Sequence, residues 1–128
     1  MTTEERAELG AEAKKSWNCC QAVVLAYKDE LSCDVDTLMQ SAAAFGSGMG
    51  CMDGTCGALC GAAIVAGQLV QGNRPAAAKV AAQTLQTFRE LSGSTICREL
   101  KGVDTGKMLC SCPDCVRNAV RALDGAVG

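Results

Sequence analysis

The sequence predicts an all-α fold, a single-domain helical bundle of about five helices with a Gly-rich loop before a buried central helix. Three observations favour this fold. The 128 residues are the length of one ordinary domain, so we expect residues 1–128 to form a single cysteine-rich unit. Only 3% of the residues are aromatic, while Ala and Gly are abundant, which favours close-packed helices. Several segments also carry apolar residues three and four positions apart, the spacing of one helix face.

Capping signals mark the first helices. Thr2 and Glu5 form a capping box that opens a helix running to about Lys15. A second helix begins near Asn18. The sequence leaves two candidate caps, at positions 34 and 36, for a third helix that ends at Phe45.

The segment FGSGMGCMDGTCG at 45–57 holds five glycines and is expected to form an irregular loop. Each Gly in a helix costs about 1 kcal/mol relative to Ala, so regular helix is disfavoured there. A Gly-rich loop also lets backbone N–H groups approach a ligand closely. No Gly-Lys-Ser/Thr follows, so a phosphate-binding loop is poorly supported.

The uncharged span Thr55–Gln71 is predicted to be the buried central helix. The alternative is a transmembrane span, which needs about 20 continuous apolar residues. Gly57, Gly61 and Gly67 interrupt this one, so no membrane span is expected. The four-residue spacing of Gly57 and Gly61 would let another helix approach closely.

The C-terminal half contains two more helices and an irregular segment. Asn73 and Pro75 mark the start of a helix that runs to about Leu91. An irregular stretch follows, with one short turn expected at 97–100. Pro113 then opens a last helix that extends to about 123.

Charge and composition exclude several function classes. The net charge is −2 and no basic block appears, so nucleic acid is not an expected partner. The chain has no His, which excludes Cys/His zinc sites, haem attachment through Cys-x-x-Cys-His and a His general base. The polar, acidic N-terminal stretch shows no secretory signal, so we expect a cytoplasmic protein with reduced thiols.

Ten cysteines in this length therefore indicate metal or redox chemistry more than a disulfide framework, although free Cys also serves as a small buried hydrophobe. Cys19, Cys56 and Cys112 each lie at or beside a predicted helix N-terminus. Unpaired N–H groups and the helix dipole lower the pKa of a thiol placed there. These positions predict helix ends that converge on a thiolate-rich centre. Cys33, in a polar stretch between helices, is expected to be incidental.

Two local spacings leave alternatives open. Cys56 and Cys60 lie four apart on a helix, with Cβ atoms about 5–6 Å apart, which is too far for an unstrained disulfide but compatible with one multinuclear cluster. Cys112 and Cys115 form a Cys-x-x-Cys motif, which could be a redox pair or, with Cys110, a metal-binding loop. Cys56, where the Gly-rich loop meets the central helix, is the thiol we expect to matter most. Thr55 is the expected cap of that helix.

The order of these motifs resembles the C_GCAxxG_C_C family of redox-active cysteine proteins. The segment NCCQAV at 18–23 resembles the family's Asn-Cys-Ala-x-Ala-Val, and CGALCG at 56–61 fits its Cys-Gly-Ala-x-x-Gly. The segment FGSGMG at 45–50 resembles its Phe-Gly-Gly-Gly loop, and CREL at 97–100 its Cys-Arg-x-Leu. The last cysteine region, at 112–116, is also similar.

The resemblance implies that Cys19, Cys56, Cys97 and Cys112 are metal ligands, with Cys115 as an alternative cofactor-binding residue to Cys112. It implies an iron–sulfur cluster or a similar prosthetic group, in electron transfer or redox sensing. The extra thiols have no role assigned by the resemblance; they are Cys20, Cys51, Cys60 and Cys110.

Two other functions use the same residues. One is a metal-free thiol/disulfide or persulfide (chalcogen) carrier, with Cys112 and Cys115 as the pair. The other is a structural Zn(Cys)4 protein. In each case the redox partner protein is unknown, a homodimer is an open alternative to a monomer, and no enzymatic reaction is assigned.

Overall fold

The computed structural model describes residues 1–128 and confirms the all-α prediction. Seven α-helices are present where about five were expected, and α6, at the predicted short turn, is little more than one turn long. The helices are α1 (Thr3–Ala13), α2 (Cys19–Ala26), α3 (Val35–Ser41), α4 (Gly57–Leu69), α5 (Arg74–Ser92), α6 (Cys97–Lys101) and α7 (Cys112–Val127). Two 3-10 turns, Lys28–Glu30 and Ala43–Phe45, and a π turn, Gly48–Met52, complete the elements.

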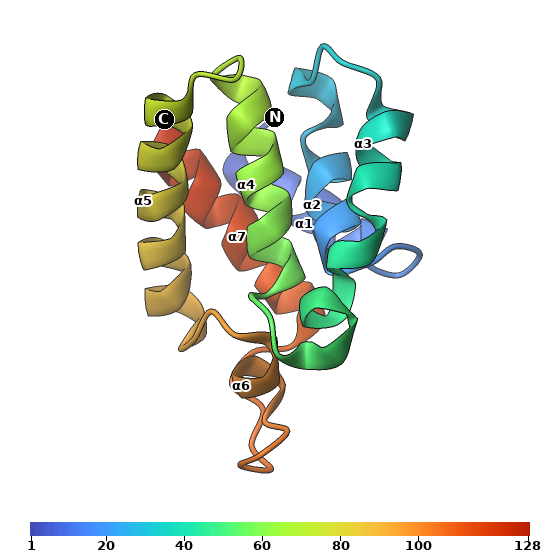
Figure 1. Ribbon diagram of the computed structural model, residues 1–128, viewed down its shortest axis with the longest axis vertical. Coiled ribbons are helices and arrows are strands. Elements are labelled where there is room, and N and C mark those ends of the chain that lie inside the picture. Colours follow the sequence, from blue (N-terminus) through green and yellow to red (C-terminus); the bar gives the residue numbers. More distant parts are fainter.

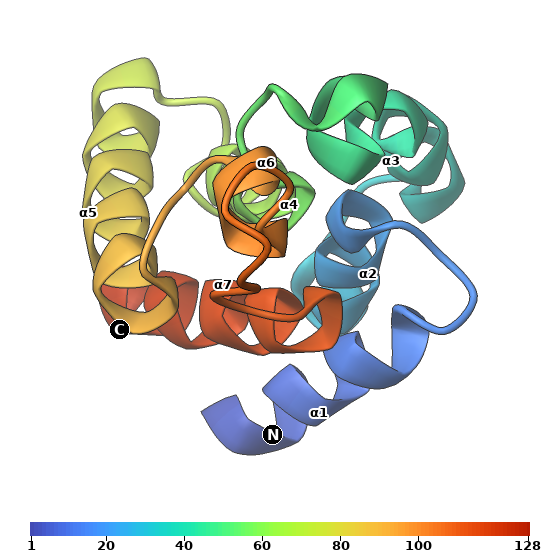
Figure 2. The ribbon, with the colours of Figure 1, turned by 90° about the horizontal axis from the view of Figure 1, so that it is seen from below.

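Helix α4 lies in the middle of the bundle, with α5 on one side and α2 on the other (Figure 1). Helix α7 crosses behind it and packs against α1, α2, α4 and α5. Helix α6 lies at one end of the bundle, below the start of α4, as Figure 2 shows from that end. The starts of α4, α6 and α7 therefore meet at this end.

The capping signals in the sequence account for most helix starts. Asn18 caps α2 in a capping box with Gln21, as Thr2 does for α1 with its own partner. Asp34, not Asp36, caps α3, and Asn73 caps α5. Ser111 caps α7, with Pro113 in the first turn as expected.

Two helix ends differ from the prediction. Helix α3 ends at Ser41, and the expected continuation to Phe45 tightens into the 3-10 turn Ala43–Phe45. Helix α7 continues to Val127, past the predicted end at 123, and Asp124 in this extension accepts hydrogen bonds from the hydroxyls of Thr3 and Tyr27.

The prediction that Thr55 caps the central helix is wrong. Cys56 occupies the N-cap position of α4, and no side chain caps the helix there. Thr55 instead forms an isolated antiparallel bridge with Ile96. That pairing extends the backbone before α4, so the helix starts one residue beyond the point where Thr55 could cap it.

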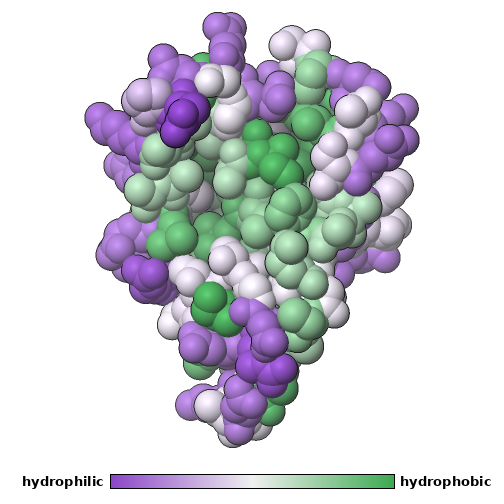
Figure 3. Space-filling model, in the orientation of Figure 1, coloured by the Kyte–Doolittle hydropathy of each residue, from purple (hydrophilic) through white to green (hydrophobic).

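Helix α4 provides much of the core, together with Val23 and Val24 of α2 and the C-terminal helix. A Cβ atom on Gly61 would lie 2.6 Å from the carbonyl oxygen of Cys20, so the bare glycine lets α2 and α4 approach closely. The outer face of α4, including Ala63 and Ile64, remains at the surface, where Figure 3 shows a broad apolar area. No helix in the structure has the length and hydropathy needed to cross a bilayer.

The Gly-rich loop is irregular, as predicted. Backbone φ is positive at Ser47, Gly48, Met49, Gly50 and Met52, a conformation that regular helix does not allow. The loop folds back on itself, and the N–H of Gly54 donates to the carbonyl of Gly48 at 3.0 Å. It thereby forms one wall of the site described next.

Candidate functional site

Four cysteines from distant parts of the chain line one small cavity of about 110 Å³ at the lower end of the bundle. The cysteines are Cys19, Cys56, Cys97 and Cys112. Each stands at the start of a helix: Cys19 begins α2, Cys97 begins α6, Cys112 begins α7, and Cys56 is the N-cap of α4. Three of these cysteines were predicted from their places at helix starts, and the fourth, Cys97, only from the family resemblance.

The Thr55–Ile96 bridge sets Cys56 and Cys97 beside each other. The N–H of Cys56 donates to the carbonyl of Thr95 at 2.8 Å, and the N–H of Cys97 donates to the carbonyl of Gly54 at 3.0 Å. These two backbone bonds join segments about 40 positions apart in the chain. The bridge therefore holds the starts of α4 and α6 in register.

Two glycines let the walls of the cavity close. A Cβ atom on Gly57 would lie 2.9 Å from the carbonyl of Phe45 and 3.4 Å from the Cβ of Cys19. A Cβ atom on Gly48 would lie 2.5 Å from the Cβ of Cys97, and its φ of +55° also favours glycine. Side chains at either position would push the Gly-rich loop away from the cysteines.

Cys112 and Cys19 form the first thiol pair. A hydrogen bond from Cys19 lowers the pKa of Cys112 to about 5, against the effect of burial and with help from the Lys101 ammonium. The pKa of Cys19 is raised by the same hydrogen bond and by burial. Cys112 is half-buried and Cys19 is buried, so the acidic thiol is the more accessible of the two.

Cys56 and Cys115 form a second, deeper pair. The hydrogen bond with Cys115 lowers the pKa of Cys56 to about 7 despite burial, and the N–H groups of Ala58 and Leu59 face the sulfur from the first turn of α4. Cys115 has a raised pKa because of that hydrogen bond and its burial. The Cys-x-x-Cys motif of α7 thus directs its two thiols to two different partners, and Cys115 does not line the cavity.

Lys101 is a site residue that the sequence analysis missed. It ends α6, lines the cavity with the four cysteines, and its Nζ donates to Cys115 Sγ at 3.6 Å. A lone Lys at the end of a predicted short turn carries no sequence signal. Its place depends on how α6 packs beside α7.

The other cysteines lie apart from this cavity. Cys20 is buried between α2 and α4, where burial raises its pKa to about 12. Cys60 opens on a different hollow, between α4 and α5, and Cys51 is exposed on the Gly-rich loop. Cys110 is buried, and Asn118 donates to its sulfur at 3.8 Å. Cys33 is half-buried near α3.

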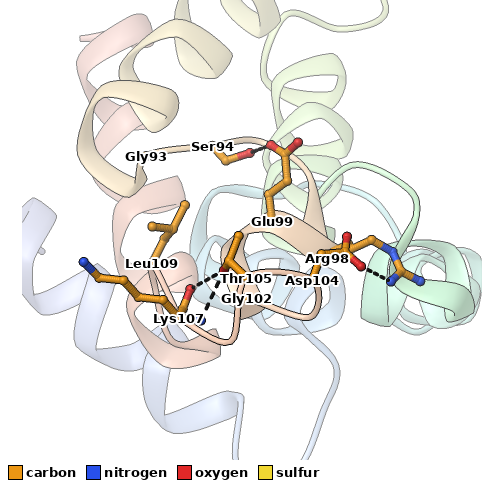
Figure 4. Close-up of a pocket in the computed structure, with 9 residues that line it drawn as sticks. All are labelled: Gly93, Ser94, Arg98, Glu99, Gly102, Asp104, Thr105, Lys107 and Leu109. Carbon is orange, nitrogen blue, oxygen red and sulfur yellow. Dashed lines mark hydrogen bonds and ion pairs between the residues drawn. The ribbon is translucent and has the colours of Figure 1, made fainter.

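A larger hollow of about 450 Å³ lies on the opposite side of α6 (Figure 4). Its lining is mostly polar and contains no cysteine. Arg98 is ion-paired there with Asp53 and Asp104, and Ser94 donates to Glu99. These charged and polar groups pair with one another and no cysteine lies among them, so this hollow is separate from the cysteine cavity.

A comparison with models of known protein families shows which family this chain belongs to. Residues 17–125 match the model of the family described as "Putative redox-active protein (C_GCAxxG_C_C)". The chain belongs to the C_GCAxxG_C_C family. No curated protein and no solved structure matches it.

The matched range of the C_GCAxxG_C_C family runs from the residue before Asn18 to most of α7 and contains every residue that lines the cavity except Lys14. Only α1 lies outside it, and α1 contributes Lys14, next to its last turn, to the cavity wall. The resemblance expected from the sequence is therefore confirmed at the level of the family. The roles of the individual cysteines as ligands stay predictions.

Proposed function

We propose that this chain is a redox protein in which Cys19, Cys56, Cys97 and Cys112 hold an iron–sulfur cluster for electron transfer or redox sensing. One observation carries the proposal: four helices each place a cysteine at their N-terminal end around a single cavity. Four Cys thiolates are the usual ligand set of [2Fe–2S] and [4Fe–4S] clusters. A cluster bound there would supply a one-electron couple.

The donor set suits an anionic sulfur-bound group. The cavity lining contains Lys14, Lys101 and Asn18 and no carboxylate. Thiolates at helix N-termini are stabilised by the helix dipoles, as their ligation to iron requires. The Gly-rich loop lies against Cys97, since a Cβ on Gly48 would be 3.4 Å from Cys97 Sγ. Hydrogen bonds from backbone N–H groups to the sulfurs would help to set a cluster's potential.

A structural zinc would use the same four cysteines, and the two centres differ in how the sulfurs must be arranged. A mononuclear Zn(Cys)4 site needs four sulfurs converging on one point, each about 2.3 Å from the metal. Cysteines spread around a shared cavity fit a multinuclear group better, because its ligands bind different metal atoms.

Anaerobic purification followed by iron, zinc and acid-labile sulfide analysis tests the proposal. We expect iron and sulfide together, with visible absorbance, and loss of both in Cys56→Ala. Cys51→Ala is the matched control, since Cys51 lies on the adjoining loop but is exposed outside the cavity. Zinc without sulfide, or equal iron in the Cys56→Ala and parent proteins, would contradict the cluster.

A metal-free dithiol is the second candidate, favoured by the pairing of Cys112 with Cys19. An accessible thiolate next to a buried thiol is the arrangement of an attacking and a resolving cysteine. The Cys112 thiolate would attack a partner's disulfide and release one partner thiolate. Cys19 would then lose its proton and attack the mixed disulfide, which leaves a Cys19–Cys112 disulfide and a reduced partner.

Mass spectrometry of metal-free protein exposed to a disulfide reagent distinguishes this second function. A Cys19–Cys112 disulfide that forms and is reduced reversibly supports it. A metal content close to one cluster per chain, with all four cysteines protected from alkylation, supports the first.

A further inference from the structure

Lys101 is a half-buried cation that has no carboxylate partner. Its Nζ donates to the carbonyl of Cys110 at 2.8 Å and to Cys115 Sγ at 3.6 Å. The ion pairs of the structure are made by other cations, namely Arg6, Lys15, Arg98, Arg117 and Arg121. The Lys101 ammonium therefore has sulfur atoms, and no carboxylate, as its nearest partners that can carry negative charge.

The electrostatics around Lys101 are dominated by thiols. Burial alone would lower the pKa of Lys101, but the nearby sulfur groups of Cys115, Cys112 and Cys56 outweigh burial and raise it. The same ammonium helps to lower the pKa of Cys112 and Cys56. The influence is mutual, as expected for opposite charges that share a partly desolvated site.

The position of Lys101 in the fold also places its charge beside the cavity cysteines. Lys101 ends α6, the element that also supplies Cys97, and its side chain reaches the wall of the cysteine cavity. Figure 2, seen from below, shows α6 at the end of the bundle where α4 begins. The cavity that Lys101 lines also contains Cys19, Cys56 and Cys112, so one lysine lies near cysteines from three other elements. Its bond to the Cys110 carbonyl fixes the side chain in that direction.

We propose that Lys101 is a positioning residue that sets the reduction potential of the cysteine cavity by stabilising its reduced, more negative form. This inference rests on the proposed redox function, but it holds for either centre. Oxidation of a thiolate and a thiol to a disulfide removes one negative charge, releases one proton and gives up two electrons. Oxidation of a cluster likewise removes one negative charge for each electron lost. A nearby cation opposes both changes.

The test uses the metal-free, full-length protein equilibrated with glutathione and glutathione disulfide. Glutathione disulfide is the oxidant: for each protein disulfide formed, one glutathione disulfide accepts two electrons and two protons and becomes two glutathione molecules. The fraction oxidised is read by rapid alkylation and mass spectrometry. We expect Lys101→Met to shift the equilibrium at least about tenfold toward the disulfide, equivalent to about 30 mV more negative for a two-electron couple.

Matched variants separate charge from shape. Lys101→Arg keeps the charge and should stay within about threefold of the parent, or about 15 mV. Lys107→Met removes a lysine from the separate hollow beyond α6 and should leave the equilibrium unchanged. Lys101→Gln removes the charge but retains a donor for the Cys110 carbonyl, so it serves if Lys101→Met unfolds, as judged by circular dichroism.

The outcomes are distinct. A folded Lys101→Met or Lys101→Gln protein with the parent potential overturns the inference and leaves the redox function standing. An equal shift in Lys101→Arg also overturns it, since shape rather than charge would then act. If the parent thiols never oxidise at any glutathione ratio, and no cluster is bound, both the inference and the proposed function fail.

Discussion

Thr55 and Ile96 form a short antiparallel bridge that joins the Gly-rich loop to the segment before α6. Two backbone bonds flank it, from Cys56 to Thr95 and from Cys97 to Gly54. The bridge thus connects two cavity cysteines through the backbone, independently of their side chains. The walls of the cavity are held even when the thiols are free.

We expect the amide protons of Cys56 and Cys97 to exchange slowly and at similar rates. Both donate to buried or half-buried carbonyls in the bridge, so their exchange requires the bridge to open. Hydrogen exchange followed by NMR measures this. The amide of Cys33 makes no backbone hydrogen bond and serves as the fast-exchanging comparison. Equally fast exchange at all three positions would show that the bridge is not formed in solution.

The sequence predicted the helices better than the site, because helix starts depend on neighbouring residues in the chain. Capping at Thr2, Asn18 and Asn73 depends on residues within one turn, so the helix starts could be predicted directly. The wrong prediction at Thr55 comes from a bridge to Ile96, and no local pattern indicates a pairing across 41 positions. Tertiary pairing overrode the local capping preference there.

The same limit applies to the site. Cys19, Cys56 and Cys112 could be singled out because helix starts are visible in the sequence. The pairing of Cys112 with Cys19, rather than with Cys115, depends on how α2 and α7 meet, as does the approach of Lys101. The Cys-x-x-Cys spacing left open a redox pair within the motif or a metal-binding loop with Cys110, and in the structure α7 directs the two thiols toward different elements.

Gly61→Ala should destabilise the protein by about 1–3 kcal/mol, the usual cost of overpacking. The added Cβ would lie 2.6 Å from the carbonyl oxygen of Cys20, and backbone cannot move aside cheaply. Gly67→Ala is the matched control on the same helix, because a Cβ there meets nothing within 4 Å. It should stabilise by up to about 1 kcal/mol through reduced backbone entropy. Denaturant unfolding compares them, and equal effects would contradict the close packing of α2 on α4.

Arg6→Met should destabilise the protein by about 1–3 kcal/mol, since it leaves buried polar groups without a partner. Arg6 is buried, donates to the carbonyl of Ala26 at 2.6 Å and stacks over Tyr27 with 4.6 Å between the guanidinium and the ring centroid. The exposed pair of Lys15 and Glu12 provides the contrast, and Lys15→Met should change stability by less than about 0.5 kcal/mol. Thermal unfolding of the two variants checks this. A similar small change in both would show that Arg6 is not held as described.

Cys112 should be alkylated at a rate that is nearly constant above about pH 6. A pKa of about 5 leaves this thiol ionised throughout the neutral range, and only the thiolate reacts with iodoacetamide. The rate should fall only as the pH drops through that pKa, because protonation then removes the nucleophile. Cys19→Ala removes the hydrogen-bond donor that contributes most to the shift, so the pKa of Cys112 should rise and its labelling at pH 6 should slow, by about tenfold for each unit by which the new pKa exceeds 6. Cys19→Ser keeps a donor and should retain most of the parent rate.

Timed labelling with mass spectrometry of metal-free protein measures all three proteins. A parent rate that still climbs about tenfold per pH unit through pH 8 would show that Cys112 is an ordinary thiol and that the Cys19 hydrogen bond does not form.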